Sequence, residues 1–164
     1  MRNGSRWRVA ATLGVALLVS GSGLASAQQL AVGKPLGPAE AIQLAERYAP
    51  DPVPGTFRLD IRHSGKDKGI VFLNTEQDYR DPRCVSVELL PDVAKKLGKR
   101  LDGKPAKVLI GKTLLVTGEV RRVPIILVDI NNKRRLRSGL EPLPAYYQVH
   151  VFVRNADQIQ VLEA

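Results

Sequence analysis

One stretch of alternating residues, 112–123, constrains the fold of this chain more than any other. Leu114, Val116 and Val120 fall on the same face as Gly118, and the opposite face is mostly polar. A period of two with β-branched side chains predicts a half-buried strand, and a glycine inside such a strand predicts a bulge or a barrel corner. We therefore expect a strand that bends at Gly118 within a small closed or nearly closed sheet.

The remaining pattern predicts a mainly β domain. Alternating or continuously apolar residues predict four further strands, at 57–62, 70–73, 85–89 and 147–154. Residues 63–69 are predicted to form a turn. Residues 155–161, near the end of the sequence, are predicted to pair with the strand at 112–123. The lone Cys84 permits no intramolecular disulfide, and its place at the start of an apolar run predicts a packed side chain.

Two helices are predicted around these strands. Residues 38–48 contain good helix formers, with Pro38 suited to the first turn and Pro50 among the prolines that end the helix. The spacing predicts one buried face, formed by Ala41, Leu44, Ala45 and Tyr48. Residues 92–97 predict a short helix closed by Gly98.

The N-terminus has the order of a secretory signal peptide. Arginines precede an apolar run, which is followed by small residues that end at Ala27. We expect cleavage before Gln28 and export to the periplasm or the exterior, with no transmembrane segment after cleavage. A retained N-terminal anchor is the alternative. The chain then divides into a signal peptide at 1–27, a lead-in and helix at 28–55, and one domain at 56–164.

A resemblance to a known class of proteins is carried by three segments: VFLNTEQDYRDPRCVSVEL, LIGKTLLVTGEVRRV and YYQVHVFVRNADQIQVL. They resemble exported bacterial proteins with an OB-fold, a nucleic-acid-binding-like domain, over roughly residues 56–162. The resemblance implies a five-stranded Greek-key barrel with a short helix between its third and fourth strands. This chain adds an N-terminal helix and an enlarged connection between the fourth and fifth strands. The resemblance implies a binding role and identifies no ligand residue by position.

Positive charge is concentrated in the second half of the chain. The whole sequence has a formal net charge of +9, and between Lys95 and Arg137 basic residues exceed acidic ones by ten. A patch of one sign favours an anionic partner such as nucleic acid, phosphorylated lipid or acidic glycan. A solvated basic surface without a partner is the alternative.

The candidate binding residues combine phosphate neutralisation with stacking. Basic side chains flank or occupy the connection between the last two long strands, and two tyrosines lie among polar loop or strand-end residues. Although aromatic residues make up only 5% of the chain, stacking is the usual way in which OB-folds hold single strands. Phe72 is assigned to the core. The candidate nucleic-acid-binding residues are Arg121, Arg122, Lys133, Arg134, Arg135, Arg137, Tyr79 and Tyr146.

The sequence does not indicate catalysis. It has only two histidines, His63 and His150, and it lacks the common serine-hydrolase, zinc-protease, redox and phosphate-loop motifs. We therefore expect no enzyme activity and no cofactor, and we place His150 at the surface or half-buried in its strand. Three carboxylates share one loop without a calcium-loop pattern, and neighbouring arginines could pair with them, so we expect no metal. They are Glu76, Asp78 and Asp81.

The sequence leaves two rival functions open. The protein could be a cell-envelope structural or protein-interaction module that uses the barrel face or residues 125–130 as an added strand. It could also be a divalent-metal-dependent nuclease, because some nucleases are built on the same barrel. The favoured function is an exported, non-catalytic protein that binds nucleic acid or another anionic polymer, with single-stranded nucleic acid as one candidate partner.

Overall fold

The computed structural model describes residues 34–126 and 146–162. The predicted signal peptide therefore lies outside the described residues, as do four of the candidate binding residues: Lys133, Arg134, Arg135 and Arg137. None of the helices within the described ranges is long and apolar enough to cross a membrane.

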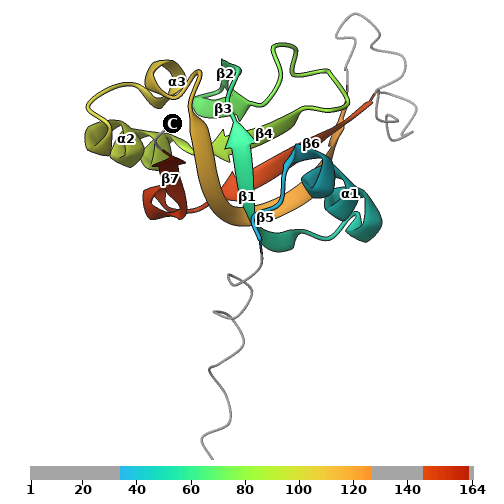
Figure 1. Ribbon diagram of the computed structural model, residues 1–164. Helices are drawn as coiled ribbons and strands as arrows, with labels where there is room; N and C mark the ends of the chain where they lie inside the picture. The colour runs from blue at the N-terminus through green and yellow to red at the C-terminus, as the bar shows by residue number, and fades with distance from the viewer. Residues whose placement is uncertain (1–33, 127–145, 163–164) are drawn as a thin grey trace, which may run out of the picture.

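The described chain is mainly β, as predicted. Its strands are β1 (Val53–Asp60), β2 (His63–Asp67), β3 (Ile70–Asn74), β4 (Val85–Leu89), β5 (Thr113–Ile125), β6 (Tyr146–Val153) and β7 (Ile159–Leu162). The helices are α1 (Pro38–Tyr48), α2 (Pro91–Arg100), the short α3 (Pro105–Val108) and a 3-10 turn, η2 (Ala156–Gln158). In Figure 1, α1 lies at one end of the sheet, and α2 and α3 lie at the other.

The strands form one mixed, open sheet of seven strands. The order is β1-β5-β6-β4-β3-β2. The seventh strand, β7, pairs with the first part of β5, and β6 pairs with the second part. Only β4 and β6 run parallel; the other pairs are antiparallel. The sheet was predicted to be closed or nearly closed. In the described residues it is open, because its edges, β1 and β2, do not form a ladder with each other.

The first predicted strand is divided by a change of partner. β1 ends at Asp60 and pairs with β5, whereas β2 begins at His63 and pairs with β3. The predicted turn at 63–69 is wrong, because the reversal needs only Lys68 and Gly69, both with positive φ. Ser64 in β2 also donates a hydrogen bond of 2.6 Å to the carbonyl of Ala106 in α3.

The central strand behaves as its pattern predicted. Leu114, Val116 and Val120 are fully buried, and β5 curves strongly between β1 and β6 (Figure 1). At Gly118 the backbone passes so close to β6 that an added Cβ would overlap with the carbonyl oxygen of Phe152. The glycine therefore permits the close crossing at which β5 exchanges β7 for β6 as its neighbour.

The helices agree with the prediction at their starts and differ in detail. α1 begins at Pro38 and buries Ala41 and Ala45, but Tyr48 is 50% exposed and does not belong to the buried face. α2 continues past Gly98 to Arg100, so Gly98 is not its cap. A Cβ at Gly98 would lie 2.9 Å from the carbonyl oxygen of Gly103, which shows that this glycine permits close packing of the following loop.

Candidate nucleic-acid interface

A row of polar side chains crosses one face of the sheet. The strand register places His63 opposite Asn74, Asn74 opposite Ser86, Ser86 opposite His150, and His150 opposite Arg121. Directly paired residues in neighbouring strands point to the same face of a sheet. The face that turns away from the apolar core is therefore polar along β2, β3, β4, β6 and β5.

This face contains a cavity of about 480 Å³, which we call the main cleft. One wall is the hairpin of β2 and β3, which contributes Gly65 and Asp67 on the cleft face, and another is the loop after β3, which contributes Tyr79 and Arg80. Ile125 at the end of β5 and Tyr146 at the start of β6 also line the main cleft and pair with each other. The volume falls within the range of small-ligand sites.

Both tyrosines predicted to stack therefore line the same cleft. Tyr79 is 38% exposed, and the guanidinium carbon of Arg80 lies 4.5 Å from the centre of its ring. Phe72, which the sequence analysis assigned to the core, is half-buried and lines the same cleft. The reason is that β3 is apolar on both faces, and Phe72 belongs to the face opposite Val71 and Leu73.

A hydrogen-bonded chain forms part of the floor of the main cleft. The two ring nitrogens of His150 lie 3.2 Å from Glu88 Oε2 and 2.8 Å from Gln148 Oε1. Gln148 Nε2 in turn donates to the hydroxyl of Tyr146 at 3.1 Å. His150 is only 5% exposed, so its predicted surface or half-buried position is wrong. This series of hydrogen bonds connects the buried His150 with Tyr146, which lines the cleft.

Aromatic rings continue from this floor toward β5. The ring of His150 neighbours those of Phe72 and Phe152, with centroid separations of 5.6 and 6.0 Å. The guanidinium carbon of Arg121 lies 3.6 Å from the centre of the Phe152 ring. Such a contact holds a cation against an aromatic face. Arg121 therefore belongs to the same face as the main cleft.

Arg122 lies on the other face of β5, although the sequence analysis grouped it with Arg121. Successive side chains of a strand point to opposite faces, and the guanidinium carbon of Arg122 lies 3.7 Å from the centre of the Tyr147 ring. The structure thus separates two of the predicted phosphate-binding residues. The other four, in residues 133–137, lie outside the described ranges.

The three carboxylates of the loop after β3 have separate partners. Glu76 forms an ion pair with Arg62 at 2.9 Å, Asp81 forms one with Arg83 at 2.7 Å, and Asp78 accepts a backbone hydrogen bond. In the part of the chain that the structure describes, no three metal-binding side chains come together. The carboxylates therefore shape this loop through their arginine and backbone contacts.

The Asp81 contact makes a prediction about pH. Hydrogen bonds from the Arg83 side chain and backbone lower the pKa of Asp81 from 3.8 to about 2. A lowered pKa in the folded state stabilises the fold above pH 3.8, and this contribution is lost as the pH falls through about 2. The loss should be small because the pair is exposed. Carboxyl NMR titration of Arg83→Gln should move the Asp81 midpoint back toward 3.8, and an unchanged midpoint would refute the contact.

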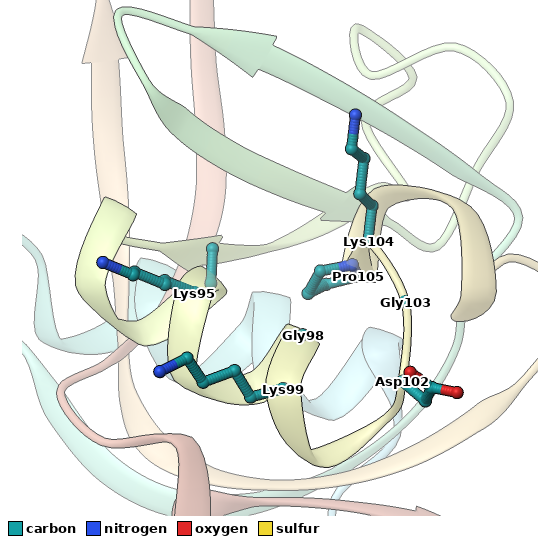
Figure 2. A pocket seen from close by; sticks show the side chains of 8 residues that line it. Lys95, Gly98, Lys99, Asp102, Gly103, Lys104 and Pro105 are labelled. Atoms are coloured by element: carbon teal, nitrogen blue, oxygen red, sulfur yellow. The ribbon is translucent and has the colours of Figure 1, made fainter.

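A second basic surface lies away from the main cleft, on α2 and the loop to α3. An open hollow there is bordered by Lys95, Lys99, Asp102 and Lys104. Figure 2 shows that Lys95 and Lys99 project to one side, whereas Lys104 and Asp102 project in other directions. Because the ammonium groups do not converge, this surface lacks the arrangement of a phosphate site. Much of the charge excess found in the sequence is therefore spread over a helical surface outside the cleft.

Comparison with known proteins does not add to this geometry. No protein-family model matches the chain, and no curated protein matches it significantly. The function must therefore be inferred from the chemistry of the main cleft.

Proposed function

We propose that this protein is exported, that it has an OB-type fold, and that its main cleft binds single-stranded nucleic acid without catalysis. The observation that carries the proposal is the convergence of Phe72, Tyr79 and Tyr146 on one cleft, beside the cation of Arg80. Aromatic faces can stack on bases of any sequence, and cations can neutralise the phosphates between them.

The strand order supports the OB-type assignment. β1 and β2 act as two parts of one bent first strand, joined through Ile61 and Arg62. The amide of Ile61 donates to the carbonyl of Lys112 beside β5, and the amide of Arg62 donates to the carbonyl of Asn74 in β3. The chain thus passes from one edge of the open sheet to the other within two residues. An OB-fold is itself a partly open Greek-key barrel.

The position of the main cleft also supports the proposal. OB-folds bind oligonucleotides across their second and third strands, between the loop that follows the first strand and the loop that precedes the last. The corresponding elements here are β3, β4 and the β2–β3 hairpin, which all contribute to the cleft. Ile125 and Tyr146 mark the two ends of the long connection that precedes the last strand.

An envelope protein-interaction module remains the second candidate. β2 is an edge strand, and edge strands can accept an added strand from a partner. Ile126, just beyond β5, is 42% exposed and could extend such a contact. Salt separates the two candidates, because phosphate binding weakens steeply with added salt and strand addition does not.

Replacement of the stacking tyrosines tests the proposal. Tyr79→Leu and Tyr146→Leu should each weaken binding of a fluorescent single-stranded oligonucleotide about 5- to 150-fold, which corresponds to the loss of one stacked base. The matched control is Tyr48→Leu, because Tyr48 is an exposed tyrosine on α1 that does not line the main cleft. Fluorescence anisotropy at two salt concentrations gives both the affinity and its salt dependence.

Three outcomes would contradict the proposal. The wild-type protein could fail to bind oligonucleotides, Tyr48→Leu could weaken binding as much as the cleft variants, or an acidic polysaccharide could bind as tightly as the single strand. Double-stranded oligonucleotide serves as a further competitor. Incubation of the labelled strand with calcium or magnesium tests the nuclease alternative, for which cleavage would be the positive result.

A further inference from the structure

A second cavity, of about 270 Å³, lies between α1 and the sheet. We call it the α1 cavity. Ile42 and Glu46 contribute to it from α1, and Arg122 and Tyr147 contribute from β5 and β6. The helix that forms its wall precedes the segment that resembles OB-fold proteins. The α1 cavity is therefore built from an addition to the barrel rather than from the barrel alone.

The α1 cavity adjoins the main cleft. Arg80, Tyr146 and Gln148 line both cavities. Tyr146 therefore stands between them, with the cation of Arg80 at the same boundary. The hydroxyl of Tyr146 accepts the hydrogen bond from Gln148, which is itself bonded to the buried His150. Hydrogen bonds thus connect Tyr146, at the boundary between the cavities, to the buried floor of the main cleft.

We propose that a single strand bound in the main cleft continues past Tyr146 into the α1 cavity, which holds a second nucleotide. This inference rests on the proposed function. Arg122 supplies a cation for the phosphate, and its guanidinium is held over the Tyr147 ring at 3.7 Å. Guanidinium groups form directed, charge-assisted hydrogen bonds with phosphate oxygens.

The charge distribution sets the orientation of the nucleotide in the α1 cavity. Glu46 is an exposed carboxylate on α1 and would repel a phosphate. It can, however, accept a hydrogen bond from an exocyclic amino group, as carboxylates do with cytosine. The phosphate therefore lies toward Arg122 and the base toward α1. Asp81, the other acid of this cavity, is already paired with Arg83.

A length series with Arg122→Gln tests the inference. Wild-type affinity should rise between cytidine monophosphate and a tetranucleotide of cytidines, because only the longer ligand reaches both cavities. Arg122→Gln should leave monophosphate binding unchanged and weaken tetranucleotide binding about 10-fold, the size of one charge-assisted contact. It should also lower the slope of log affinity against log salt by about 0.7. The control is Arg58→Gln, because Arg58 is exposed on β1 and lines neither cavity.

The possible results separate this inference from the proposed function. If Arg122→Gln and Arg58→Gln weaken tetranucleotide binding equally, or if affinity does not rise with length, the α1 cavity is not a subsite. The main cleft would still stand if Tyr79→Leu weakens binding in the same assay. If the wild-type protein binds none of these ligands, both the subsite and the proposed function are wrong. Thermal melts of each variant identify any loss that is caused by unfolding.

Discussion

Gly118→Ala should lower the free energy of unfolding by about 3 kcal/mol, the upper end of the usual cost of overpacking. The added Cβ would overlap with the carbonyl oxygen of Phe152 and would also lie 3.1 Å from Val151 Cγ1. A flexible side chain could move away, but this carbonyl belongs to the backbone of the neighbouring strand. Relief therefore requires β5 and β6 to separate at the point where β5 changes partners.

The matched control is Gly65→Ala in β2. Gly65 has no atom within 4 Å of the added Cβ, and its φ is not in the left-handed region. The same chemical change should therefore alter stability by less than about 1 kcal/mol, the usual difference between glycine and alanine. Urea denaturation of both variants measures the difference. Equal midpoints for the two variants would show that β5 and β6 do not cross closely at Gly118.

The sequence was sufficient to predict the elements whose own residues carry a strong pattern. The strand around Gly118 alternates clearly, and α1 begins at Pro38 and ends before Pro50, both of which follow from local chemistry. β2 was missed because His63–Asp67 has no apolar alternation. Such a segment becomes a strand through its hydrogen bonds with β3, which a local pattern cannot indicate.

The candidate site was predicted only in part for a related reason. Polar surroundings correctly selected Tyr79 and Tyr146 as residues that lie outside the core, and the structure brings them to one cleft. The contact between Glu88 and His150 could not be predicted, because it depends on the parallel pairing of β4 with β6.

Replacing the basic residues of the long connection should produce the largest change in the salt dependence of binding. The change is a fourfold substitution to glutamine, at Lys133, Arg134, Arg135 and Arg137. If each of these side chains contacts a phosphate, the slope of log affinity against log salt should fall by about 3, with affinity reduced across all sequences. Stability should barely change, because a hydrophilic sequence of this kind buries little apolar surface.

The position of the connection supports a direct role for these residues. Ile125 and Tyr146 form the last pair of the ladder between β5 and β6, and both line the main cleft. The chain therefore leaves the described sheet at the cleft and returns to it there. The lysines of α2, in contrast, belong to an element that does not line the main cleft.

The lysines of α2 and its following loop supply the charge-matched control. A fourfold change to glutamine at Lys95, Lys96, Lys99 and Lys104 removes the same charge from exposed positions that do not line the main cleft. If the phosphate contacts are local to the connection, the α2 variant should keep most of the wild-type slope of log affinity against log salt. The reason is that long-range attraction is screened beyond about 10 Å at 0.1 M salt. If both fourfold variants lose equal slope, binding depends on net charge and the connection is not a site. If neither variant loses affinity, phosphate is not what the protein recognises, and the exposed edge of β2 becomes the better candidate for its binding surface.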